Sequence, residues 1–197
     1  MNRPRAYHHG DLRAELLERA EATLRTSGVD SLTLRQLARE TGVSHAAPNR
    51  HFRDKQALLD ALALVGFERL AALYADAAID GTFSERVFAT ARIHLRFAVD
   101  NPALLTLMFS RKNSADVGTE LAAAMQQTFA SAITLMAEGQ SSGEVVPGDP
   151  VRLSMLLAAA VHGLADFVVS GFLTEEVAEE LLRETITNFI LGFRLQS

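Results

Sequence analysis

Along most of the chain, apolar residues return every three or four positions, which places them on one face of an α-helix. The first such set is Leu12, Leu16, Ala20 and Leu24. Strict alternation of apolar and polar residues, the pattern of a half-buried strand, never extends beyond a few residues. The sequence therefore predicts an all-α protein of about nine helices.

Residues that commonly begin and end helices divide this pattern into segments. Ser, Thr and Asp are expected to cap helix N-termini, and Gly or Pro to end the helices. The predicted helices cover residues 12–27, 33–41, 44–52, 54–81, 84–100, 102–109 and 116–138, followed by one that begins at 150 and one from 174 to about 195. The long fourth helix would join a three-helix head to a larger helical body.

Residues 33–52 have the features of a helix-turn-helix, in which two short helices are joined by a turn that contains glycine. Gly42 can adopt the positive φ that lets the second helix cross the first. Ser44 is placed to cap that second helix. Pro48 lacks the N–H that would bond to the Ser44 carbonyl, a loss that a local 3₁₀ turn or a shifted cap can absorb.

The exposed side of the second helix carries side chains suited to DNA. His45, Ala46, Asn49 and Arg50 would face a major groove, where Arg and Asn suit guanine and adenine edges. Residues 1–55 contain ten Arg or Lys against seven Asp or Glu, whereas the remainder contains nine against seventeen. A basic head on an acidic body is typical of a module that binds a polyanion.

Two overlapping stretches resemble the DNA-binding domain of the TetR (tetracycline repressor) family. They are YHHGDLRAELLERAEATLRTSGVDSLTLRQLA (residues 7–38) and LTLRQLARETGVSHAAPNRHFRDKQALLDAL (residues 32–62). The resemblance spans about residues 9–70 and leaves 71–197 as a ligand-binding and dimerisation domain. It implies a bacterial, homodimeric regulator of transcription. Such a protein is most often a repressor that binds a palindromic double-stranded operator until a small-molecule effector releases it.

The resemblance also assigns roles in the head. Thr33, His51 and Lys55 would contact the DNA backbone, and Arg35, like His45, would lie near bases. The residues expected to bind DNA are Thr33, Arg35, Gln36, Ser44, His45, Ala46, Asn49, Arg50, His51 and Lys55.

One position departs from the family pattern. The family usually has tyrosine where this chain has Asn49, in PNRHF rather than PYRHF. Asparagine is shorter and loses an apolar contact, so either the affinity for the operator is lower or Asn49 reads a base. The alternative function is therefore a helical interaction or ligand-sensing module whose DNA binding is weakened.

The last two predicted helices are apolar over much of their circumference, so each must be covered on more than one side. They could form the core of a monomer, but the interface of a four-helix homodimer is favoured. A two-fold dimer would place two recognition helices one DNA turn apart, about 34–36 Å, and would require a palindromic site.

The C-terminal body also contains candidates for a ligand site. His162 and Asp166 are four residues apart and share a helix face. VHGLADF resembles the Trp-His-Gly motif of one TetR subgroup, with Val161 in place of tryptophan. His162 and Asp166 could line a cavity or form a structural pair that bridges two helices. The predicted ligand-binding residues are His94, Phe97, Met108, Met125, Phe129, His162 and Asp166.

Several other functions receive no support from the sequence. The chain has no cysteine, no glycine-rich phosphate loop and no nucleophile beside a base, so we expect no enzyme, no cofactor and no metal site. The N-terminus lacks the apolar segment of a signal peptide. The apolar window Leu156–Leu173 contains His162 and Asp166, which favours a buried helix over a membrane span. We expect a cytoplasmic protein.

Overall fold

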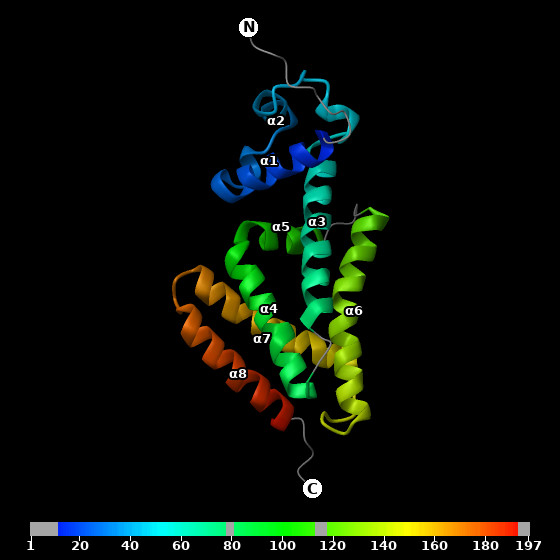
Figure 1. Ribbon diagram of the computed structural model, residues 1–197, viewed down its shortest axis with the longest axis vertical. Coiled ribbons are helices and arrows are strands. Elements are labelled where there is room, and N and C mark those ends of the chain that lie inside the picture. The colour runs from blue at the N-terminus through cyan, green and yellow to red at the C-terminus, as the bar shows by residue number, and fades with distance from the viewer. Residues whose placement is uncertain (1–11, 78–80, 113–117, 193–197) are drawn as a thin grey trace.

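The computed structural model describes residues 12–77, 81–112 and 118–192, and all regular structure within these ranges is helical (Figure 1). Two 3₁₀ turns, η1 (Val29–Ser31) and η2 (Pro48–Arg50), lie within the N-terminal head. The prediction of an all-α fold is confirmed. The eight α-helices are α1 (Leu12–Ser27), α2 (Leu34–Glu40), α3 (Lys55–Ala77), α4 (Phe83–Asp100), α5 (Pro102–Lys112), α6 (Thr119–Ser141), α7 (Pro150–Val169) and α8 (Glu175–Gly192).

The head consists of α1, α2, η2 and the first turns of α3, and lies at one end of the molecule (Figure 1). Leu16 of α1, Leu37 of α2 and Leu58 of α3 are completely buried in its core. Thr33 caps α2 as predicted, because its hydroxyl oxygen accepts the N–H of Gln36 at 3.1 Å. Gly42 has a φ of 70°, which is the turn conformation that only glycine adopts readily.

The predicted third helix, residues 44–52, is not an α-helix. The N–H of Ala47 donates to the Ser44 carbonyl at 2.9 Å, and η2 follows as a single 3₁₀ turn. The reason is Pro48, which has no N–H to give to that carbonyl, so the residue before it makes a shorter three-residue bond instead. Ala47 precedes η2 and offers no capping side chain, so the predicted capping role of Ser44 is not seen.

The helix α3 connects the head to the body. It leaves the head at Lys55 and packs between α5 and α6 further along its length (Figure 1). Arg69 of α3 donates two hydrogen bonds to Glu21 of α1, each 2.7 Å long, and Arg111 of α5 donates one to Asp60 of α3 at 2.6 Å. Polar contacts therefore tie α3 to both parts of the molecule.

Glycines allow two close approaches between helices of the body. A Cβ atom on Gly66 of α3 would lie 2.5 Å from the sulfur of Met108 in α5. A Cβ on Gly139 of α6 would lie 2.5 Å from the ring of Phe83 in α4. Both distances are too short for real contacts, so glycine at these positions sets how closely the helices pack.

Helix ends differ from the sequence expectation by a few residues. Thr82, rather than Ser84, caps α4 in a capping box with Glu85, whose carboxylate accepts the Thr82 N–H at 2.8 Å. Gly139 was expected to follow the helix that ends at residue 138, but lies inside α6 because it packs against Phe83. The expected helix start at Asp116 and helix end near Leu195 lie outside the described residues.

Two helices at the end of the chain, α7 and α8, pack on α4 and on each other. Among the described helices, α7 alone is long and apolar enough to cross a membrane by length and composition. Its apolar side chains are only partly covered within one chain: Leu156 is 50% exposed and Phe167 49% exposed. Within the described residues of one chain, α7 is therefore not a fully buried helix.

Candidate DNA-contacting surface and ligand cavity

The outer surface of the head gathers most of the side chains that the sequence assigned to DNA. Gln36 and Lys55 are half-buried, and each has a polar partner: Gln36 donates to Glu40 at 2.8 Å, and Lys55 donates to the Asp30 carbonyl at 3.3 Å. The remaining eight are exposed, namely Thr33, Arg35, Ser44, His45, Ala46, Asn49, Arg50 and His51.

Two buried side chains hold this surface in place. Pro48 begins the η2 turn and Phe52 follows two residues after its end; both are buried, and Phe52 is only 2% exposed. The guanidinium of Arg13 in α1 lies 5.7 Å from the centre of the Phe52 ring. Because the chain is anchored at both of these residues, the side chains of Asn49 and Arg50 between them remain exposed.

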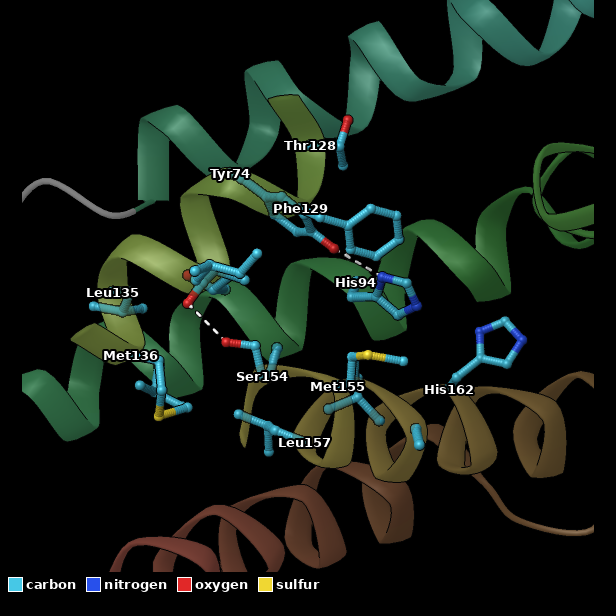
Figure 2. Close-up of a pocket in the computed structure, with 18 of the residues that line it drawn as sticks. Tyr74, His94, Thr128, Phe129, Leu135, Met136, Ser154, Met155, Leu157 and His162 are labelled. Atoms are coloured by element: carbon cyan, nitrogen blue, oxygen red, sulfur yellow. Dashed lines mark hydrogen bonds between the residues drawn. The ribbon is translucent and has the colours of Figure 1, made fainter. Parts of the chain in front are cut away.

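The body contains a cavity of about 440 Å³ between α3, α4, α6 and α7, with α5 at one end (Figure 2). Most of its wall is apolar. Tyr74 of α3, His94 of α4, Phe109 of α5, Phe129 of α6 and His162 of α7 contribute to the lining. His94 and His162 lie toward one end of the cavity, with Phe129 beside His94, and Leu135 and Met136 of α6 lie toward the other (Figure 2).

The polar groups of the cavity centre on two histidines. The hydroxyl of Tyr74 and Nδ1 of His94 share a hydrogen bond of 2.8 Å. Nε2 of His94 and Nδ1 of His162 are buried and have no hydrogen-bond partner among the described residues. The two imidazole rings are 5.8 Å apart, and the His162 ring lies 4.8 Å from that of Phe109. The cavity thus contains two polar atoms whose bonding capacity is unused.

A comparison with protein families identifies both parts of the chain. Residues 16–62 match the model for bacterial regulatory proteins of the tetR family. Residues 87–189, more than half of the chain, match the model for the tetracyclin repressor-like C-terminal domain. The chain belongs to the TetR family. Proteins of this family are DNA-binding regulators of transcription, so the head described above is a TetR-type DNA-binding head.

Solved structures with the same fold support this assignment. A protein of unknown function from Rhodococcus sp. RHA1 is 39% identical, covers 97% of this chain and 100% of its own, and has a TM-score of 0.89. The TetR family transcriptional regulator PfmR from Thermus thermophilus is 19% identical, with 91% and 99% covered and a TM-score of 0.68. A tetR family protein from Rhodococcus RHA1 is 18% identical, with 94% and 98% covered and a TM-score of 0.72. The search of curated proteins found no match.

Only some of the ligand-binding residues expected of this TetR protein lie at the cavity. His94, Phe129 and His162 line it. Phe97 and Met108 are buried in the core instead, and Met125 is half-buried outside the lining. Asp166 is exposed on α7.

The structure therefore does not show the histidine–aspartate pair that the sequence left open, because Nδ1 of His162 has no partner and Asp166 points to solvent. Among the lining residues that the sequence analysis did not select is Tyr74, the hydrogen-bond partner of His94. It follows the helical spacing of buried residues in α3, a signal of burial that does not distinguish a cavity wall from a packed core.

Burial in this TetR cavity shifts the pKa values of two side chains, His94 and Tyr74. It lowers the pKa of His94 to about 4, with a smaller contribution from the charge of His162. Burial also raises the pKa of the Tyr74 hydroxyl. Tyr74 and His94 are thus both neutral near pH 7.

The depressed pKa of His94 predicts a pH-dependent stability. Between pH 6.5 and 4 the unfolded chain binds a proton at His94 that the folded protein does not, so the stability is full above pH 6.5 and falls as the pH decreases toward 4. His94→Asn keeps an acceptor for Tyr74 but cannot be protonated. In denaturant titrations at pH 7 and 4.5, we expect the wild-type protein to lose about 2 kcal/mol more than His94→Asn.

His51→Asn, at an exposed histidine of the head, is the control and should lose as much stability as the wild type. Parallel pH curves for the wild type and His94→Asn would contradict the assignment of a low pKa to this residue.

Proposed function

We propose that this protein is a repressor that binds a palindromic operator as a homodimer and leaves it when a small molecule enters the cavity. The observation that carries the proposal is the continuity of α3, which begins at Lys55, shortly after the η2 turn proposed here to contact DNA, and reaches the cavity at Tyr74. Residues 9–70 are proposed as the DNA-binding domain and 71–197 as the ligand-binding and dimerisation domain. A regulator of this kind acts in the cytoplasm and needs no catalytic residue or cofactor.

The coupling between the two sites is proposed to run along α3. Lys55 and Tyr74 are separated by 19 residues, or roughly 30 Å of helix at about 1.5 Å per residue. Tyr74 lines the cavity, and its hydroxyl is bonded to His94 of α4. A ligand that changes this contact would shift α3 against α4 and so change the position of the head. It can do so only to the extent that it binds the two arrangements with different affinity.

On the DNA side, the proposal assigns base contacts to His45, Ala46, Asn49 and Arg50 of the η2 region. The four lie on one exposed stretch of chain, which is the arrangement that a recognition element requires. Arg35 of α2 is proposed to lie near bases as well. Contacts to the DNA backbone are proposed for Thr33, His51 and Lys55, with Gln36 and Ser44 completing the DNA-binding set.

Replacement of Arg50 tests whether the head reads DNA. On a duplex recovered by selection from a random pool, Arg50→Ala should lose about 1–3 kcal/mol of binding free energy at fixed salt, because one arginine–base contact is removed. Fluorescence anisotropy of the labelled duplex measures this. Arg96→Ala, at an exposed arginine of α4 in the body, is the matched control and should bind like the wild type.

The salt dependence separates this function from the alternative of a module with weak DNA binding. The wild-type affinity should fall steeply as salt rises, since phosphate contacts release counterions. A flat salt response, or equal affinities of Arg50→Ala and the wild type, would favour the alternative.

The unusual Asn49 gives a second test on the same duplex. A tyrosine at this exposed position is long enough to reach a phosphate, so Asn49→Tyr should tighten binding several-fold, or by about 1 kcal/mol. Asn49→Ala removes the asparagine without adding a new contact and should bind no better than the wild type. If both variants bind more weakly, Asn49 reads a base and the predicted gain from tyrosine is wrong.

The homodimer is proposed to form through α7 and α8. The two helices contact each other and share exposed apolar side chains, including Leu156, Phe167 and, in the turn between them, Phe172. A patch of this kind on a soluble protein commonly marks an interface. A second copy related by a two-fold axis would cover it and place two heads on one side of the assembly, as a palindrome requires.

Leu156→Glu should weaken this self-association. A carboxylate at the centre of an apolar interface would be buried without a partner, so we expect the dimer dissociation constant to rise at least about tenfold in sedimentation experiments. Leu73→Glu is the control: Leu73 is 42% exposed, similar to Leu156, but lies on α3. Equal effects of the two substitutions, or none from either, would place the interface elsewhere.

A further inference from the structure

We propose that the cavity binds an uncharged, mainly apolar molecule that places one hydroxyl group between His94 and His162. This proposal names the chemical class of the effector and rests on the function proposed above. Four observations on the cavity lead to it: the absence of charge in its wall, the bonds already made by its polar groups, the tautomer of His94, and the position of the two histidines.

The first observation excludes a charged ligand. The described residues that line the cavity include no Asp, Glu, Lys or Arg, and most of them are apolar. His94 is neutral at physiological pH because its burial disfavours the protonated form. A carboxylate, phosphate or ammonium group would therefore find no lysine, arginine or acidic side chain in the described part of the wall, and its burial there is costly. The volume of about 440 Å³ lies within the range of small-molecule sites, roughly 300–1,000 Å³.

The second observation is that the threonine and serine hydroxyl groups of the wall are already bonded to backbone. Thr90 donates to the Arg86 carbonyl at 2.9 Å and Thr128 to the Ala124 carbonyl at 2.8 Å. Ser154 donates to the Ala132 carbonyl at 3.3 Å (Figure 2). A ligand gains little by approaching these donors, because each already has an acceptor within the protein.

The two remaining polar atoms are Nε2 of His94 and Nδ1 of His162, both without partners among the described residues. Buried polar atoms are normally hydrogen-bonded, and one left unbonded destabilises the protein. A ligand that bonds to both atoms would remove this cost, so these atoms are the natural anchor for a polar group.

The third observation fixes the role of His94. If the Tyr74 hydroxyl donates to Nδ1, then His94 carries its proton on Nε2, and only that N–H lacks a partner. In the other tautomer both the tyrosine hydroxyl proton and Nε2 would be unsatisfied. The first arrangement leaves fewer unbonded groups, so His94 offers a donor. The ligand atom that meets it is an acceptor, and His162 can accept or donate beside it.

The fourth observation is position. The rings of His94 and His162 are 5.8 Å apart at one end of the cavity, and the side chains of Leu135 and Met136 lie at the other (Figure 2). A hydroxyl group both accepts and donates, so it can bond to His94 and His162 at once while an apolar body fills the remaining space. Both nitrogens are shielded from solvent in the empty cavity, so the rings must turn to admit the oxygen. That movement alters the contact between α4 and α7.

Three probes with one body and different ends test this class of ligand: 4-butylphenol, butylbenzene and 4-butylbenzoate. Binding is measured by calorimetry and by the shift in thermal unfolding, at pH 7.5 and without DNA. We expect 4-butylphenol to bind at least about tenfold more tightly than either of the other two. Equal binding of 4-butylphenol and butylbenzene, tighter binding of the benzoate, or binding of none of the three would overturn the proposal.

Variants of the two histidines test the anchor. His94→Asn keeps the bond to Tyr74 but removes Nε2, and His162→Phe removes Nδ1 while keeping an aromatic ring. Each should reduce the affinity for 4-butylphenol about tenfold and leave that for butylbenzene nearly unchanged. Thr90→Val removes a hydroxyl that already bonds to Arg86, so it should keep the preference for the phenol. Because two independent positions are changed, one variant that fails to fold leaves the other to decide. If a folded variant keeps the full preference, the anchor is wrong.

The effect on DNA distinguishes failure of this inference from failure of the proposed function. Saturating 4-butylphenol is added to the complex of protein and selected duplex. If 4-butylphenol binds more tightly than butylbenzene but leaves the affinity for DNA unchanged, the proposed ligand class is supported and the proposed release of DNA by the ligand is contradicted. If 4-butylphenol releases the DNA but binds no more tightly than butylbenzene, the proposed release of DNA by a ligand is supported and the proposed ligand class is contradicted.

Discussion

The structure depends on the burial of one helix, α3, in a hydrophobic core that continues from the head into the body. Leu58 near its start is completely buried in the head, and Phe67 and Leu70 further along are buried in the body. Each such side chain contributes about 1.5–3 kcal/mol when it is removed from water. Neither end of this core can form fully without α3, and a continuous helix transmits displacement instead of absorbing it. The head and the cavity are therefore connected by an element that is packed into both parts of the molecule.

Close packing around this helix limits how it can move. Gly66 allows Met108 to lie directly against the backbone of α3, and the ion pair between Arg111 and Asp60 joins the same two helices. On the opposite flank the Thr128 hydroxyl of α6 lies 3.2 Å from the Phe67 carbonyl of α3 and shares its one proton between that oxygen and the nearer Ala124 carbonyl. Sliding along α5 or α6 would break these contacts. Motion of α3 together with its neighbours, relative to α4 and α7 across the cavity, preserves them.

Much of this architecture could be predicted from the sequence because its signals are local. Thr33 caps its helix through an atom three residues away, and Gly42 takes the conformation that its turn requires. The effect of Pro48 could be foreseen only in part: the missing N–H was clear, but the loss of the whole α-helix depends on how Pro48 and Phe52 are anchored in the core. Helix ends near Gly139 were missed because that glycine serves a contact with Phe83, which is distant in sequence.

The cavity was harder to predict than the fold. Helical spacing shows which side chains face inward, but it does not distinguish a side chain that meets a neighbour from one that meets empty space. Met108 and Tyr74 both follow the apolar pattern, yet Met108 fills the gap beside Gly66 whereas Tyr74 borders the cavity. That difference depends on the relative placement of α3, α4 and α7, to which residues far apart in the chain all contribute.

The anchoring of η2 also bears on how this protein can change over evolutionary time. The fold of the head depends on Pro48 and Phe52, whereas Asn49 and Arg50 between them contribute almost no packing. Substitutions at the outward positions should therefore have little effect on stability, since most surface changes away from such anchors are nearly neutral. If these positions contact DNA as proposed above, the sequence that the head binds can diverge through them while the scaffold stays the same. Descendants of one such gene could thus acquire new target sites without first acquiring extra stability.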